Sequence, residues 1–177
     1  MSVVRLARIA LMVAATATLS FVRIPLPLSP VPITGQTLGT MLAGVLLGPG
    51  DGAISQAVYV FLGVVGLPLF GGLAGPGVLL GPTGGYLVGL IAGAWIVGWI
   101  SDRGEGVLPI LAGCFLGGVV AVYVPGILWL SRITRMGLGG AFLAGALPYL
   151  PGDLLKVLAT YLMAVRLDFL RRSRLQD

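Results

Sequence analysis

The sequence predicts an all-α membrane protein whose six transmembrane helices form a single domain over residues 1–177. Of the 177 residues, 57% are hydrophobic and only 10% are charged, and the mean hydropathy is +1.04. Soluble domains carry about 25% charged residues. No charge occurs in 52–101 or in 106–131. The second of these stretches is by itself long enough to cross a bilayer, which requires about 20 apolar residues.

The first helix is expected from about Arg5 to Val22. Two arginines followed by an apolar run are also typical of a signal peptide, but no soluble domain follows, so an uncleaved transmembrane helix is favoured. One face carries Ala10, Ala14 and Thr18, and small residues at this spacing let another helix approach closely. The alternative is that alanine is simply common in membrane helices.

A proline-rich loop and a pair of helices are expected next. Four prolines in 23–34 exclude a helix there and predict an extended surface loop. A short second helix is expected at 35–48 and a third at 53–67. The glycines and proline of 47–52 predict a tight turn between them.

The glycine-rich loop 68–82 leads into a fourth helix, expected at 83–100. Gly85, Gly89 and Gly93 recur every four residues on this helix, a spacing suited to close packing against a neighbour. Glycine-rich loops also bind phosphates, but no Gly-Lys-Ser/Thr sequence follows here. A loop that lets the backbone approach a ligand is the better interpretation.

The fifth helix is expected at 107–130, with a kink at Pro125. The apolar piece at 137–147 is too short to span a membrane and is expected to form a short helix at the boundary. The sixth helix is expected at 152–170. Long outer loops therefore follow helices 1, 3 and 5.

Six spans place both termini on one side of the membrane, and the basic residues near the termini indicate that this side is the cytoplasm. These residues are Arg5, Arg8, Arg166, Arg171, Arg172 and Arg174. Two further arginines, Arg132 and Arg135, fall in an outer loop and run against this topology.

One acid and one base stand at the head of the sixth helix. Asp153 and Lys156 are three residues apart, so they share one helix face. A charge within a membrane span costs roughly 2.5–3.5 kcal/mol on insertion scales. The two residues either neutralise each other or offer an acceptor and a donor to a small polar ligand. The polar openings of helices 2, 4 and 6 converge on the outer face, which favours the ligand.

Several site classes are excluded by composition. The net charge of +5 comes largely from the terminal clusters, so it does not indicate nucleic-acid binding. The chain has no histidine and one cysteine, Cys114, which excludes disulfide frameworks and His/Cys metal sites. No metal site and no cofactor are expected.

Five motifs together resemble the BioY family, the biotin-binding S components of energy-coupling factor (ECF) transporters. The resemblance covers nearly the whole chain, in the family's order. The motifs lie at residues 32–38, 46–49, 66–70, 81–86 and 150–156.

The resemblance implies six transmembrane helices in a bacterial plasma membrane and a biotin site near the outer face. Asp153 and Lys156 match the acid and base that contact biotin, and Tyr86 lies in the matching part of helix 4. The other substrate-binding candidates on the outer face are Thr34, Gln36, Gly84 and Gly85.

The same resemblance implies protein partners. The face of Ala10 and Ala14, which Thr18 continues, resembles the motif that docks on a transmembrane coupling subunit. That subunit carries two cytoplasmic ATPases.

Biotin suits the candidate pair chemically. Asp153 can accept from a urea N–H, and Lys156 can donate to the urea carbonyl or to the carboxylate. We favour the urea, but the sequence leaves both ends of biotin open. A self-sufficient secondary transporter of biotin or another small organic anion is the alternative function, although the halves show no internal repeat. An enzyme is not expected, because no nucleophile–base pair joins the two charges.

Overall fold

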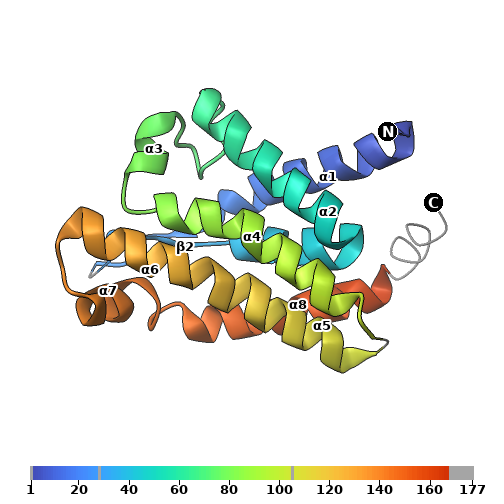
Figure 1. Ribbon diagram of the computed structural model, residues 1–177. Helices are drawn as coiled ribbons and strands as arrows, with labels where there is room; N and C mark the ends of the chain where they lie inside the picture. Colours follow the sequence, from blue (N-terminus) through green and yellow to red (C-terminus); the bar gives the residue numbers. More distant parts are fainter. Residues whose placement is uncertain (1, 28, 105, 168–177) are drawn as a thin grey trace.

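The computed structural model describes residues 2–27, 29–104 and 106–167, which form a bundle of antiparallel helices (Figure 1). The bundle begins with α1 (Val3–Ser20), two residues earlier at each end than expected. The Ser2 hydroxyl caps this helix by accepting from the Arg5 backbone N–H at 3.3 Å.

The proline-rich loop after α1 is extended, as predicted, and it is also paired. Strand β1 (Arg23–Ile24) lies antiparallel to β2 (Ile33–Thr34), with Arg23 opposite Thr34. This short hairpin holds the ends of the loop together and places Thr34 at the start of the next helix.

Helix α2 (Gln36–Val65) contains the predicted hairpin, but the turn is tighter than expected. Only Gly48 is non-helical, with φ 80° and ψ −177°, a backbone conformation that favours glycine. Pro49 then restarts the helix, where its missing N–H costs nothing. A Cβ atom at Gly52 would lie 3.0 Å from the Ala43 carbonyl oxygen, so the chain folds back on itself here. We call 36–47 the first arm and 49–65 the second arm.

The glycine-rich loop contains one element that was not predicted, the five-residue helix α3 (Pro76–Leu80). It is followed by α4 (Gly84–Ser101). The predicted close packing of α4 is confirmed. Cβ atoms added at Gly85, Gly89 and Gly93 would lie 2.3–2.8 Å from the backbone of the helix that follows in sequence.

That helix is continuous from residue 107 to residue 134. It comprises α5 (Val107–Gly113), the π-helix η1 (Cys114–Val120) and α6 (Ala121–Thr134). The irregular segment η1 thus comes before Pro125, the residue at which a kink was expected. π-Helical turns of this kind are frequent at functional sites.

The chain ends in a bent pair of helices, α7 (Leu138–Gly145) and α8 (Leu150–Arg166), whose axes differ by 54°. The predicted short helix is confirmed. The predicted end of the last helix at Leu170, and the arginines beyond it, lie outside the described residues.

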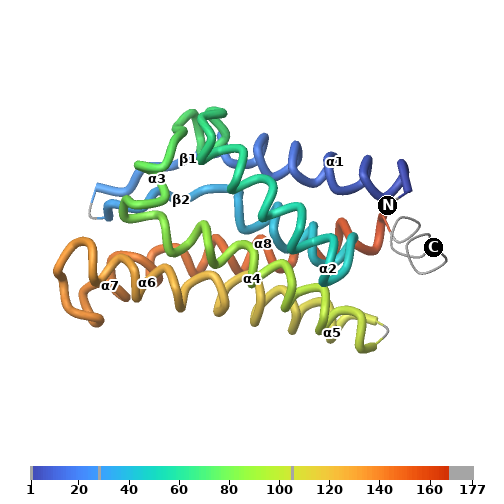
Figure 2. The backbone as a smooth tube through the Cα atoms, turned by 45° about the horizontal axis from the view of Figure 1, so that its top comes forward, coloured from blue at the N-terminus to red at the C-terminus, as the bar shows by residue number. Residues whose placement is uncertain are grey.

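By length and composition, four helices in the described part of the chain suffice to cross a membrane, or up to five if the bent pair counts as one span. The predicted six crossings are not reached on these criteria, because α2 counts as one helix although it reverses at Gly48. Arg5 makes an ion pair with Asp51 at 2.6 Å, which joins the start of α1 to the turn of α2. Figure 2 shows the end of α8 near the same end of the bundle, with β1, β2, α3 and α7 at the opposite end.

Candidate functional site

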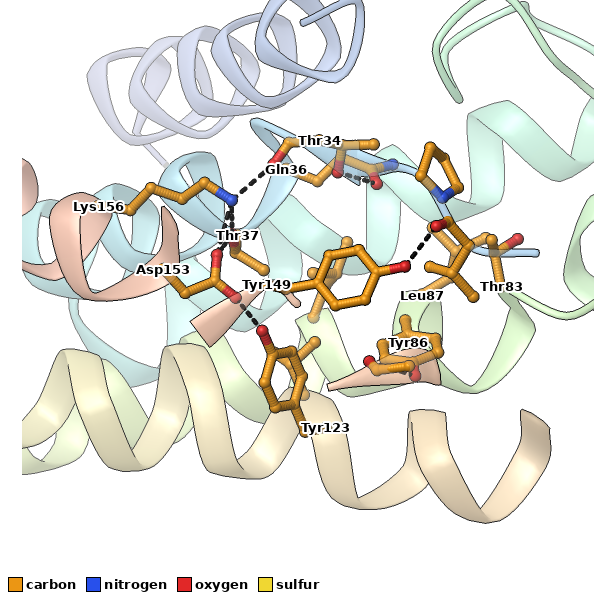
Figure 3. Close-up of a pocket in the computed structure, with 15 residues that line it drawn as sticks. Thr34, Gln36, Thr37, Thr83, Tyr86, Leu87, Tyr123, Tyr149, Asp153 and Lys156 are labelled. Carbon is orange, nitrogen blue, oxygen red and sulfur yellow. Dashed lines mark hydrogen bonds and ion pairs between the residues drawn. The ribbon is translucent and has the colours of Figure 1, made fainter. Parts of the chain in front are cut away.

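A cavity opens at the end of the bundle formed by β2, α7 and the start of α8 (Figure 3). The space inside it, including the solvent at its open mouth, is about 550 Å³. Its wall combines aliphatic side chains with tyrosines and one pair of charges. The lining residues are Val31, Pro32, Thr34, Gln36, Thr37, Thr83, Tyr86, Leu87, Leu90, Val122, Tyr123, Gly145, Tyr149, Asp153 and Lys156.

The charged pair sits in the first turns of α8, on one face of the helix, as the spacing predicts. Lys156 Nζ lies 2.6 Å from Asp153 Oδ1. The Asp153 side chain is 3% exposed and that of Lys156 is 18% exposed. Leaving either charge alone here would carry a large desolvation cost, so the two stabilise each other in the bundle.

Both charges also bind other elements of the fold. Lys156 Nζ donates to the Thr34 carbonyl oxygen at 2.7 Å and to Thr37 Oγ1 at 2.9 Å. Asp153 Oδ1 accepts from Thr37 Oγ1 at 3.0 Å, and Oδ2 accepts from the Tyr123 hydroxyl. All three N–H groups of the ammonium therefore have acceptors, whereas the carboxylate, with about four acceptor positions, has used three.

Tyr86 closes one side of the cavity, and two glycines make room for it. A Cβ atom at Gly126 would lie 2.4 Å from the Tyr86 ring, and one at Gly145 would lie 2.3 Å from its hydroxyl. The hydroxyl donates to the Gly145 carbonyl oxygen at 2.8 Å. The ring also makes an edge contact with Tyr123, with centroids 6.3 Å apart.

Tyr149, directly before α8, connects the loop between β1 and β2 to the body of the protein. Its hydroxyl donates to the Val31 carbonyl oxygen and lies 2.6 Å from Ser29 Oγ. Val31 and Pro32 form part of the cavity wall. The loop therefore shapes the cavity, and Tyr149 holds it there.

Five of the predicted substrate-binding residues line the cavity: Thr34, Gln36, Tyr86, Asp153 and Lys156. Gln36 also has a partner that does not line the cavity, because its Nε2 donates to the hydroxyl of the buried Tyr59 at 2.6 Å. These placements show proximity to the cavity, and the ligand contacts themselves stay predictions.

The structure places the other two candidates, Gly84 and Gly85, in helix contacts instead of the cavity wall. A Cβ atom at Gly84 would lie 1.7 Å from the Leu79 carbonyl oxygen, and one at Gly85 would lie 2.3 Å from the Pro125 carbonyl oxygen. Both positions need glycine because α3 and α6 approach the start of α4 so closely.

Four polar residues of the cavity wall were not among the predicted binding residues: Thr37, Thr83, Tyr123 and Tyr149. Thr37 belongs to the same polar cluster as Thr34 and Gln36, so the cluster indicates it. Tyr123 stands within a charge-free run, where a phenol needs a hydrogen-bond partner. The partner itself is not visible in the sequence.

The predicted docking residues lie apart from the cavity, on α1. Ala10, Ala14 and Thr18 are all exposed, and Thr18 Oγ1 donates back to the Ala14 carbonyl oxygen at 2.9 Å. Nothing in the described part of the chain covers this small-residue face. Within the same residues, no group of three potential metal ligands occurs.

The model of the BioY family matches residues 1–173 of the chain. The biotin transporter BioY of Rhizobium etli is 40% identical over 143 residues, which cover 76% of each chain. That of Rhodobacter capsulatus is 40% identical over 157 residues, covering 82% of this chain and 83% of the relative. A solved structure, the S-component for biotin from an ECF-type ABC transporter, matches with a TM-score of 0.87 at 32% identity. This match covers 100% of this chain and 96% of the other.

Proposed function

Because the chain belongs to the BioY family, we propose that it is the membrane-embedded, high-affinity biotin-binding subunit of an energy-coupling factor vitamin uptake transporter. The observation that carries this proposal is the cavity, which joins one acid and one base to an apolar and aromatic wall. In this function the protein is a transport subunit and not an enzyme, and biotin is its transported substrate, not a cofactor.

The chemistry of the wall suits the parts of biotin. The apolar ring system packs on the tyrosine and aliphatic side chains, where removal from water contributes about 25 cal/mol per Å². The remaining acceptor position of Asp153 takes a urea N–H. Lys156 contacts biotin by giving up one of its three acceptors, because all its donors are engaged within the protein.

The end of biotin that Lys156 contacts can be determined with an uncharged analogue. We expect a bond to the urea carbonyl, so that Lys156→Gln weakens biotin and biotinamide by the same factor. A bond to the carboxylate would instead weaken biotin much more than biotinamide, because only biotin carries the charge.

The proposal includes a membrane arrangement with six crossings. The two arms of α2 run in opposite directions, since Thr40 Oγ1 donates to Gln56 Oε1 at 3.2 Å across sixteen positions. Counting each arm as one crossing gives six and puts both termini in the cytoplasm of a bacterial cell, as the basic residues near them favour. The cavity then opens to the outside, where biotin enters.

The partners in this arrangement are a transmembrane coupling subunit and two cytoplasmic ATPases. The exposed face of Ala10, Ala14 and Thr18 supports the contact, because small side chains let a second helix approach closely. We propose that the coupling subunit docks on this face of α1.

Isothermal titration calorimetry with the purified protein and biotin tests the binding function. Asp153→Asn and Lys156→Gln are each expected to weaken binding by about 10- to 150-fold, the equivalent of one charge-assisted hydrogen bond. Arg166→Gln, which removes a charge from the other end of α8, is the matched control and should bind normally.

The double variant Asp153→Asn/Lys156→Gln distinguishes a binding pair from a structural one. It leaves no buried charge unpaired, so any remaining loss of affinity reflects lost ligand contacts. Biotin should raise the melting temperature of the native protein by mass action and do so less for the double variant. Native-like affinity in the double variant would show that Asp153 and Lys156 have a purely structural role.

A further inference from the structure

Three side chains at the far end of α4 form a continuous stack on the outside of the protein. The rings of Trp95 and Trp99 are stacked, with centroids 5.7 Å apart and planes 18° apart. The Arg103 guanidinium carbon lies 3.3 Å from the centroid of the Trp99 ring. Trp95 is 46% exposed and Trp99 is 39% exposed. We call these three residues the Trp–Arg stack.

The Trp–Arg stack lies at a membrane boundary, at the opposite end of α4 from the cavity. A Cβ atom at Gly98 would lie 2.4 Å from the backbone carbon of Gly48, so this part of α4 is level with the turn of α2. The charge-free stretch 52–101 ends immediately before Asp102 and Arg103. Tryptophan is enriched at this level of membrane proteins, where its ring faces lipid and its N–H faces headgroups.

The guanidinium of Arg103 is orientated by the ring beneath it. Stacking covers a face of the guanidinium and leaves its N–H donors at the edge, in the fork geometry that suits a phosphate. Arg5, at the same end of the bundle, is neutralised by Asp51. Among the described residues Arg103 has no such ion pair. Asp102, the preceding residue, carries the opposite charge. The attraction of a phosphate therefore depends on the N–H donors at the edge of the Arg103 guanidinium.

An apolar strip continues from the stack along α4 toward the middle of the membrane. Ala92 and Val88 are exposed one and two turns before Trp95, on the same face of the helix. The face thus combines a surface for an acyl chain with a cation at the headgroup level. A lipid with a negatively charged headgroup complements both parts.

We propose that Trp95, Trp99 and Arg103 form a binding site for an anionic phospholipid of the phosphatidylglycerol class. The lipid phosphate binds the edge of the Arg103 guanidinium, and an acyl chain lies on Trp95, Ala92 and Val88. The site is separate from the biotin cavity; it rests on the proposed membrane arrangement but not on biotin binding.

Native mass spectrometry of the full-length protein in mixed micelles tests this site. Phosphatidylglycerol and phosphatidylcholine of equal chain length are supplied in equal amounts. The native protein should retain phosphatidylglycerol preferentially and gain thermal stability from it, whereas inorganic phosphate alone should have no effect. Arg103→Gln should weaken retention about fivefold or more, as expected for one lost cation at an anionic membrane surface.

Two further variants separate the stack from charge alone. Arg103→Lys keeps the charge but loses the flat, stacked fork, so it should retain less phosphatidylglycerol than the native protein. Arg132→Gln removes an exposed arginine at the other end of the bundle and should behave like the native protein. Thermal unfolding of each variant without added lipid, compared with that of the native protein, confirms that it is folded.

Equal retention of the two lipids by the native protein would overturn the proposal, as would unchanged retention in Arg103→Gln. A variant that retains phosphatidylglycerol normally but loses copurification with a coupling subunit would show that the stack is a protein contact instead.

Discussion

Replacing Gly126 by alanine is expected to weaken biotin binding through Tyr86, although Gly126 does not line the cavity. The added Cβ atom would lie 2.4 Å from the Tyr86 ring, so the ring must move by about 1 Å to reach an ordinary contact of 3.4 Å. Because the hydroxyl lies against Gly145, we expect the displaced ring to move toward the cavity, which Tyr86 lines. Overpacking of this kind costs about 1–3 kcal/mol. If this cost applies to the biotin-bound protein and not to the free protein, the affinity for biotin falls by about 5- to 150-fold.

The assay is calorimetry on Gly126→Ala, with Gly139→Ala in α7 as the control, because a Cβ atom at Gly139 meets nothing within 4 Å. The control should bind biotin like the native protein. In a Tyr86→Leu background the shorter side chain leaves room for the Cβ atom, so Gly126→Ala should have little further effect. Native affinity in the single variant would refute the reasoning. An undiminished loss in the Tyr86→Leu background would show that the effect does not pass through Tyr86.

Three other outcomes are expected. Reporter fusions at both termini should report a cytoplasmic location and a fusion at Gly72 an outer one, and an outer signal from either terminus would contradict six crossings. Ala10→Trp/Ala14→Trp should block copurification with a coupling subunit through steric bulk while biotin binding persists; normal transport by this variant would exclude the docking face. Tyr149→Phe should accelerate biotin dissociation several-fold in stopped-flow experiments, since one hydrogen bond that holds the loop at Val31 is worth about 0.5–1.5 kcal/mol. An unchanged dissociation rate would show that the loop does not limit release.

Helix positions followed from the sequence with small errors, because they depend on local chemistry. Long charge-free stretches and glycine- or proline-rich breaks are properties of neighbouring residues, and the bilayer requirement translates them directly into helices. The turn of α2 was predicted at 47–52, and the structure narrows it to Gly48. The five motifs identified the family, which the family model and the named relatives confirm.

The number of membrane crossings depends on more than local chemistry. The first arm of α2 is shorter than a full span, so hydropathy alone cannot decide whether 36–65 crosses once or twice. The antiparallel contact between Thr40 and Gln56 shows that the chain reverses. Likewise, α3 in the glycine-rich loop was not predicted, because five residues with three apolar side chains carry no periodic signal.

The sequence by itself determined the acid–base pair, because a spacing of three residues places Asp153 and Lys156 together on any helix. It also determined that α4 carries a face of small residues, but not which neighbour packs on that face. Only the tertiary structure decided that Gly85 packs on α6. It also decided that Thr37 and Tyr123, which are 116 and 30 positions from Asp153, share its carboxylate. The physical reason is that helix faces follow from local geometry, whereas contacts between helices depend on how the whole bundle packs.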